Sequence, residues 1–135
     1  MLKPKTAFYL AAAMTIVPTY SAFAHSHTVQ NGHALVQDVY KPGTEIEFDE
    51  DQDEVFAAVK KGDIRPFSEM YAAVERDLHG RIIEVELEED DGIWVYELKL
   101  NHNNNIIKVE YNAQTFEMLK IKGRNFTKAM KKLED

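Results

Sequence analysis

Three histidines near the amino terminus have the residue type and spacing best suited to metal chemistry. If the chain is cleaved after Ala24, the new terminus reads His25-Ser26-His27. A free α-amine, two backbone amides and an imidazole at the third position can surround Cu(II) or Ni(II) in a square-planar nitrogen set. His25 could add a further ligand, and His33 lies near. Periplasmic copper or nickel binding is therefore one of two functional hypotheses.

Other patterns that could bind ions or catalyse reactions lack essential residues. The acids of 49–53 have the odd spacing of a calcium loop, but Glu54 replaces the required glycine and Lys60 the bidentate glutamate. Acids between 84 and 91 alternate along a predicted strand, so half of them point to solvent rather than into a cleft. The sequence has no cysteine, no Gly-x-Ser-x-Gly, no phosphate-binding glycine loop and no His-Glu-x-x-His. We expect a protein that is not an enzyme and needs no cofactor.

The charge balance argues against nucleic acid as a partner. Acidic residues outnumber Lys and Arg 23 to 16, for a net charge of −7. Affinity for nucleic acids and anionic membranes depends on basic surfaces. Without cysteine the chain also has no disulfide to stabilise a small core, and dimerisation or a partner protein would cover the apolar surface left over.

The residues that come before the core-forming part resemble an export signal. Residues 1–24 have two lysines, an apolar run over 7–17 and an Ala-Phe-Ala cleavage site at 22–24. The apolar run is shorter than the roughly 20 residues of a membrane span. We predict a cleaved signal peptide and a periplasmic protein with no stable membrane insertion; an uncleaved anchor is the alternative.

One amphipathic helix is predicted to cover the core. Pro66 suits its first position and Gly80 its end, so that the helix would end at His79. Its apolar residues recur at a 3.6-residue period: Phe67, Met70, Tyr71, Val74 and Leu78.

The residues after this helix alternate between apolar and polar, which is typical of strands with one buried face. Asp91-Gly92 and Asn103-Asn104 suit the positive φ angles of two-residue hairpin turns. A fourth strand, 117–121, would return beside the third. The predicted apolar pairs are Leu87–Tyr96, Val85–Leu98, Ile83–Leu100, Leu100–Ile107, Leu98–Val109, Tyr96–Tyr111, Val109–Leu119 and Ile107–Ile121, and Glu84 pairs with Lys99 on the polar face.

The flanking segments are less regular. Residues 25–50 read as a flexible lead-in, in which 45–48 could form a short edge strand. A second, shorter helix follows, with acids at its start, Lys60 and Lys61 at its end and Gly62 as its stop. The basic tail 123–135 has apolar residues at helical spacing; it either folds back on the domain or serves as a handle for a partner or anionic lipid.

These elements predict an α+β fold. Two N-terminal helices pack on one face of a four-stranded antiparallel meander, and a short C-terminal helix follows. The segments are a signal peptide (1–24), a lead-in (25–50), a domain (51–122) and a basic amphipathic tail (123–135).

The domain resembles the PepSY family over about 53–122. The resemblance rests on 55–67, on Tyr71–Arg76, on 78–87, on Trp94–Leu98 and on Asn112–Thr115. The family usually has Asp-Ala-x-Thr-Gly at the last turn, whereas this chain has Asn112 and Phe116. Because of this departure, the sequence does not decide whether the turn keeps a left-handed residue. It also predicts an exposed aromatic ring at the sheet's edge.

The resemblance implies a secreted, non-catalytic module, such as those in protease propeptides. We expect a modulator of an envelope protease or sensor protein, or a homodimer, with metal binding as the alternative. Contact with the partner is expected at the strand edge and the tail: Trp94, Phe116, Phe126, Lys128, Met130 and Lys131.

Overall fold

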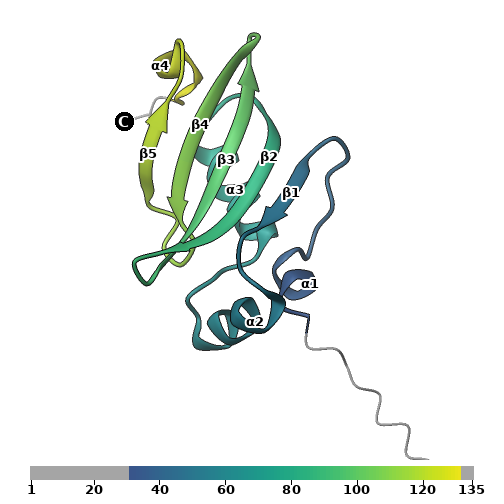
Figure 1. Ribbon diagram of the computed structural model, residues 1–135. Helices are drawn as coiled ribbons and strands as arrows, with labels where there is room; N and C mark the ends of the chain where they lie inside the picture. The colour runs from purple at the N-terminus through teal and green to yellow at the C-terminus, as the bar shows by residue number, and fades with distance from the viewer. Residues whose placement is uncertain (1–30, 132–135) are drawn as a thin grey trace, which may run out of the picture.

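The protein has an α+β fold in which a five-stranded mixed sheet is combined with four helices (Figure 1). The computed structural model describes residues 31–131. The strands lie in the sheet in the order in which they occur in the chain. The helices are α1 (Gly32–Val36), α2 (Gln52–Lys61), α3 (Phe67–Asp77) and α4 (Phe126–Ala129), and the strands are β1 (Glu45–Phe48), β2 (Arg81–Asp90), β3 (Ile93–His102), β4 (Asn105–Asn112) and β5 (Met118–Lys122).

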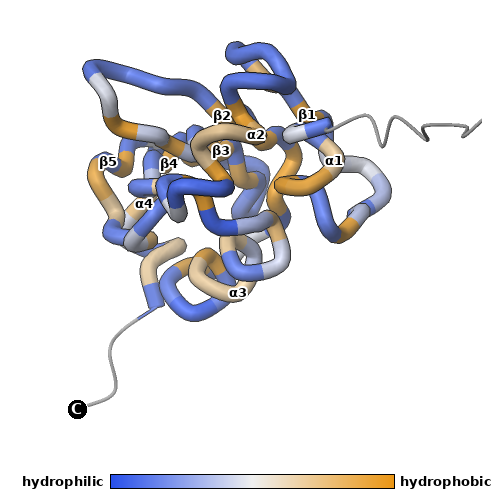
Figure 2. The backbone as a smooth tube through the Cα atoms, turned by 90° about the horizontal axis from the view of Figure 1, so that it is seen from below, coloured by the Kyte–Doolittle hydropathy of each residue, from blue (hydrophilic) through white to orange (hydrophobic). Residues whose placement is uncertain are grey.

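Helix α3 covers one face of the sheet and supplies the predicted apolar stripe. All five residues of the stripe are buried. Phe67 packs edge-on against Tyr96 of β3, with 5.7 Å between the ring centroids. Figure 2 looks at the molecule from below and shows α3 as a layer of its own beside the strands. The core therefore lies between α3 and the sheet, as the two periodicities predict.

The ends of α3 differ from the prediction. Pro66 is the N-cap rather than the first helical residue, and the helix stops at Asp77 instead of His79. Leu78 is extended because it forms a β-bridge with Met130 in the C-terminal segment. The C-terminal tail therefore replaces the expected glycine stop.

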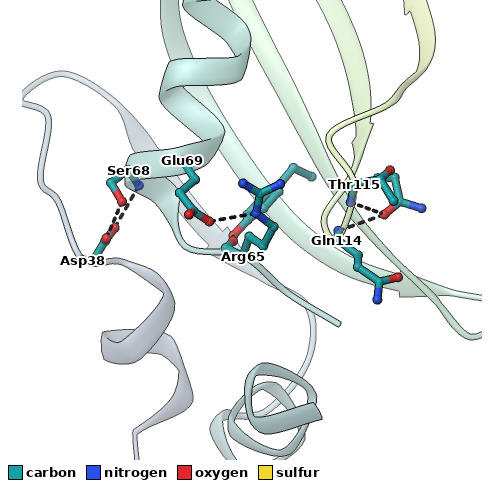
Figure 3. Close-up of polar contacts among 8 residues, drawn as sticks. Asp38, Arg65, Ser68, Glu69, Gln114 and Thr115 are labelled. Atoms are coloured by element: carbon teal, nitrogen blue, oxygen red, sulfur yellow. Dashed lines mark hydrogen bonds and ion pairs between the residues drawn. The ribbon is translucent and has the colours of Figure 1, made fainter. Parts of the chain in front are cut away.

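A carboxylate far away in the sequence caps the start of α3. Pro66 makes no side-chain cap hydrogen bond. Instead Asp38 accepts a hydrogen bond from the backbone N–H of Ser68 at 2.9 Å and another from the Ser68 hydroxyl, as Figure 3 shows. A capping oxygen satisfies one of the free N–H groups at a helix start. The contact also fixes the segment after α1 to the domain.

The hairpins β2–β3 and β3–β4 have the predicted turns. Asp91 and Gly92 have φ of 49° and 80°, and Asn103 and Asn104 have φ of 50° and 62°. Six of the seven predicted pairs across these hairpins are confirmed, and the pair of Ile83 with Leu100 is wrong. Ile82 lies opposite Leu100, because the register shifts between Ile82 and Glu84.

Strand β5 pairs with β4 in a register that differs by two residues from the predicted one. Ile121, rather than Leu119, lies opposite Val109. The register shifts again between Glu110 and Tyr111, which leaves Leu119 as an extra residue and 46% exposed. Bulges of this kind are frequent at sheet edges. Ile121 nevertheless packs against the core, because a shift by an even number keeps the face of a strand.

A fifth strand corrects the prediction of a four-stranded antiparallel meander. Strand β1 pairs with β2 in the parallel direction, and Ile46 lies opposite Val85. It adds to the core through Ile46 and Phe48. The suggested short edge strand at 45–48 is confirmed, whereas the helix at 32–36 corrects the prediction of a flexible lead-in, because α1 packs on α2.

Helices α1 and α2 lie together at one end of the sheet, whereas α3 alone occupies its face (Figure 1). The prediction of two helices on one face is corrected accordingly. Helix α2 has the expected ends: Asp51 accepts hydrogen bonds from the N–H groups of Asp53 and Glu54, and Gly62 stops the helix with φ 81°. Gly32 is required where the two helices meet, since a Cβ there would lie 2.3 Å from the Gln52 carbonyl oxygen.

The C-terminal segment folds back on the domain. The N–H of His79 donates to the carbonyl of Ala129 at 2.7 Å, and the N–H of Lys131 donates to the carbonyl of Asp77 at 2.9 Å. Ala129 is buried within the short helix α4. Of the two predicted arrangements of the tail, docking on its own domain is the one observed up to Lys131.

Candidate functional site

The face of the sheet opposite α3 carries charged side chains in ordered rows. Within residues 31–131 no helix lies on this face (Figure 1). One row runs through directly paired residues of all five strands, and four glutamates in it are followed by a lysine. Its members are Glu47, Glu86, Glu97, Glu110 and Lys120.

The neighbouring row has a different order of charges. Two glutamates on β1 and β2 are followed by three lysines on β3, β4 and β5. We call the two rows the charged sheet face; its acidic side is at β1 and β2 and its basic side at β5. The second row consists of Glu45, Glu84, Lys99, Lys108 and Lys122.

Ion pairs neutralise only part of this face. Lys99 binds Glu84 at 3.0 Å, and Lys108 binds Glu97 at 2.6 Å. Among the described residues no such pair forms at Glu47, Glu86 or Glu110. Like charges on neighbouring strands repel one another. The face therefore has an excess of negative charge that a cationic partner would compensate.

The repulsion is visible in the pKa of Glu86. Partial burial, the neighbouring Asp49 carboxyl and the charges of Glu88 and Glu97 raise this pKa to about 7. The pKa of Glu88 is raised as well, by burial and by the charge of Glu97. The protonation state of Glu86 thus changes close to neutral pH.

Two groups of carboxylates on this side lie close enough to share a cation. Each group places its oxygen atoms within 4.8 Å of one another, and the groups are Glu47, Glu84 and Glu86, and Asp49, Glu86 and Glu88. Carboxylate oxygens suit Ca²⁺ or Mg²⁺. Exposed acids gather in this way in many proteins without a metal, so the arrangement alone assigns no ion.

Trp94 and Phe116, two predicted partner contacts, are buried. Trp94 is 7% exposed and Phe116 5%. The ring of Phe116 stacks on Tyr96, and the Arg65 guanidinium lies over the Phe116 ring, 4.6 Å from its centroid. The expectation of an exposed aromatic ring at the sheet's edge is wrong for Phe116, because the turn directs the ring inward.

The turn at Phe116 keeps a left-handed residue without glycine. Phe116 has φ 57°. The Asn112 side chain accepts hydrogen bonds from the N–H groups of Gln114 and Thr115, at 2.8 and 3.1 Å (Figure 3). The side-chain amide oxygen thus closes the turn in the way that an aspartate carboxylate would.

The predicted contacts in the tail are only partly available. Phe126 is half-buried and Met130 is 40% exposed. Lys128 is exposed, whereas the ammonium of Lys131 donates to the backbone carbonyl of Glu75. The structure places these four side chains around the docked α4, away from Trp94 and Phe116, and their role in binding stays a prediction.

The predicted metal site falls largely outside the structure. His25 and His27 lie outside the described residues, and so does the predicted signal peptide (1–24). His33 stacks on Phe48 at 4.0 Å between centroids, and its Nε2 bonds the Glu50 carbonyl oxygen at 2.8 Å. One histidine of the proposed set therefore serves packing at the end of the sheet, and metal binding by the terminus stays a prediction.

The order of charges across the strands was not foreseen. The alternation had predicted the polar residues of β2, β3 and β4 on this face. The rows appear only when β1 is placed beside β2 and β5 is paired in its observed register. A test of the charge patterns on each candidate register could have found them.

Comparison with known proteins identifies one family. Residues 67–121 match the family model of the PepSY domain, described as the peptidase propeptide and YPEB domain. The match begins with α3 and ends inside β5, so it covers that helix and the four antiparallel strands. No curated protein and no solved structure matches the chain significantly. None of the helices within 31–131 has the length and apolar character that a membrane span needs.

Proposed function

Because residues 67–121 are a PepSY domain, we propose that the protein is a non-catalytic binding protein that modulates a partner in the cell envelope. The partner we propose is an envelope protease or the extracytoplasmic domain of a sensor protein. The family description, which joins peptidase propeptides with the YPEB domain, supports a binding role of this kind. Export through the segment 1–24 to the periplasm is part of the proposal.

The observation that carries the proposal is the charged sheet face. It is open to solvent in the described part of the chain, and several of its carboxylates form no ion pair there. Electrostatic complementarity increases the association rate and the specificity of protein pairs. A partner that presents Lys or Arg residues would relieve the repulsion around Glu86. We therefore propose a basic surface or segment as the part of the partner that is bound.

In-cell crosslinking tests the proposal. A photo-crosslinking amino acid replaces Glu45, at the rim of the face, and crosslinked proteins are identified by mass spectrometry. The same side chain at Lys60, an exposed residue of α2, provides the background. We expect one dominant envelope protein from position 45 and not from position 60.

A neutralised face provides the decisive comparison. Glu47, Glu86 and Glu110 are changed to Gln, which removes negative charge and also reduces repulsion, so that the fold is retained. The matched control changes Asp53 and Asp63 to Asn and Glu117 to Gln. These three residues lie outside the face. The first variant should lose the crosslinked partner and the second should keep it. Equal recovery with both variants, or recovery of only a second copy of the chain, contradicts the proposal.

A further inference from the structure

A groove on the other side of the molecule has features that the proposed function does not use. It has a volume of about 430 Å³ and lies between the segment before β1, the C-terminal half of α3 and the start of β2. Pockets of 300–1,000 Å³ are typical of sites for small ligands. The groove is large enough for a molecule of a few carbon atoms or for one or two residues of a peptide.

A buried hydroxyl without a hydrogen-bond partner forms part of its wall. Tyr71 is 6% exposed, and its hydroxyl oxygen has no hydrogen-bond partner among the described residues. An unsatisfied buried hydroxyl is unfavourable and therefore rare in native proteins. The hydroxyl oxygen is shut off from solvent in the free protein, so a ligand would accept a hydrogen bond from it, and remove this cost, only after a small shift of the groove wall.

Three cationic side chains line the same groove. The Lys41 ammonium lies 4.4 Å from the centroid of the Tyr71 ring, and Arg81 begins β2 beside it. Neither Lys41 nor Arg81 forms an ion pair with any residue of 31–131. Lys131 is held at the rim by the Glu75 carbonyl. The cationic side chains therefore outnumber the acidic ones in the lining of the groove, and a buried, unpaired hydroxyl lies behind its wall.

The backbone around Arg81 is shaped to keep its guanidinium in place. A Cβ on Gly43 would lie 3.1 Å from Nη1 of Arg81, so glycine lets the chain pass close to it. The hydroxyl of Thr44 donates to the Ile82 carbonyl at 3.0 Å and holds this segment against β2. Lys41 and Arg81 thus line the same groove from two segments that are hydrogen-bonded to each other.

We infer that this groove is a binding site for a carboxylate, carried by a free small acid or by an acidic residue of a peptide. The guanidinium of Arg81 offers paired donors that match a carboxylate, Lys41 adds charge, and Tyr71 adds a neutral donor. Glu75 also lines the groove. Its negative charge disfavours a phosphate dianion more than a single carboxylate, which is the reason for assigning the site to a carboxylate.

Titration of the purified protein with defined probes tests the inference. Butyrate, a single carboxylate, represents the free acid, and acetyl-Glu-Glu-Glu-amide represents the acidic peptide; acetyl-Gln-Gln-Gln-amide and inorganic phosphate are the comparisons. Binding is followed by amide shifts in NMR spectra. We expect saturable shifts around the groove from at least one carboxylate probe, and the probe that binds more tightly identifies the source. No saturation by either probe, or tighter binding of phosphate, overturns the inference.

Two variants separate binding from folding. Arg81→Gln should weaken carboxylate binding about tenfold, the usual effect of losing a charge-assisted hydrogen bond. Tyr71→Phe should raise the melting temperature of the free protein, because the unpaired hydroxyl is removed, and still weaken binding severalfold. Lys61→Gln, at an exposed position of α2 outside the groove and outside the charged sheet face, is the matched control and should bind like the wild type.

A chain shortened to end at Lys131 is titrated in parallel, because Glu134 and Asp135 follow closely in the sequence and could compete for the site. Binding by either form supports the inference. Wild-type affinity of both Arg81→Gln and Tyr71→Phe refutes it. The charged sheet face takes no part in these titrations, so that failure here leaves the proposed partner binding untouched.

Discussion

The ring of Phe116 stacks on the ring of Tyr96, with centroids 6.4 Å apart and planes 23° from parallel, although residue 116 has a left-handed backbone. The Tyr96 hydroxyl donates to the Arg65 carbonyl at 2.6 Å, and the N–H of Arg65 donates to the Ala113 carbonyl at 2.9 Å. Burial raises the pKa of Tyr96, so this hydroxyl keeps its proton over the physiological range. The stack thus connects the turn before β5 to the start of α3.

At position 116, a glycine variant should be more stable than an alanine variant, which is the reverse of the usual order of stability. Phe116→Ala loses the buried ring and keeps an unfavourable φ, so we expect a loss of about 3 kcal/mol in the free energy of unfolding. Phe116→Gly loses the same ring but removes the left-handed strain, which amounts to about 1 kcal/mol. Urea denaturation should therefore find the glycine variant the more stable of the two. An alanine variant equal to or more stable than glycine would show that the backbone carries no strain.

The long-range cap of α3 should be measurable. Asp38→Ala leaves the Ser68 N–H without its acceptor, so the free energy of unfolding should fall by about 1 kcal/mol. Asp38→Asn keeps an oxygen acceptor and should lose less. Chemical denaturation of both variants measures the difference. Equal stability of the alanine variant and the wild type would mean that water replaces the cap.

Stability should decrease as the pH rises from about 5 to 8. The pKa of Glu86 is about 7 in the folded protein and has an ordinary value of 4.5. Between these values the folded state holds more protons than the unfolded state, so raising the pH favours unfolding. The raised pKa of Glu88 acts in the same direction. Below this range the trend reverses, since hydrogen bonds from Arg76 and Tyr111 lower the pKa of Asp77.

Thermal melting across this pH range measures the effect. Glu86→Gln should flatten the dependence and raise the melting temperature at pH 8, whereas Glu117→Gln, at an exposed position, should leave the slope unchanged. A wild type that becomes more stable between pH 5 and pH 8 would contradict the assigned pKa.

The crossing of α1 and α2 should not tolerate a methyl group. Alanine normally stabilises a helix relative to glycine. At Gly32, however, the new Cβ would lie 2.3 Å from both the Gln52 carbonyl oxygen and the Phe56 nitrogen. We expect Gly32→Ala to lower stability by about 1–3 kcal/mol, as overpacking does. Leu35→Ala, at a 42% exposed position of the same helix, serves as the control in urea denaturation. A Gly32→Ala variant as stable as this control would rule out tight packing there.

The parts of the fold that depend on local signals could be predicted from the sequence. Asp91-Gly92 and Asn103-Asn104 determine two turns, and alternation then determines most of the pairing. The bulge at Ile83 and the extra residue Leu119 could not be predicted, because a bulge has no strong signal in the chain. Strand β1 was recognised only as a segment, since its pairing partner lies about 40 residues further along.

The candidate sites depend on contacts that no local pattern reveals. Phe116 stands where the family has glycine, and its burial depends on Arg65 and Tyr96, which come from other elements. Tyr71 belonged to the predicted core stripe, and this is confirmed. That its hydroxyl would lack a partner, beside Lys41 and Arg81, requires the three-dimensional structure.

The parallel pairing of β1 with β2 has a consequence for the order of assembly. The first strand to be synthesised must wait for its neighbour, since Phe48 cannot pair before Leu87 has been added to the chain. The two hairpins close over short loops and can form quickly, whereas a contact across a long intervening segment is slower. We therefore expect strand β1 to join the sheet last, and because it lies at the edge of the sheet its amides should exchange with deuterium before those of the central β3.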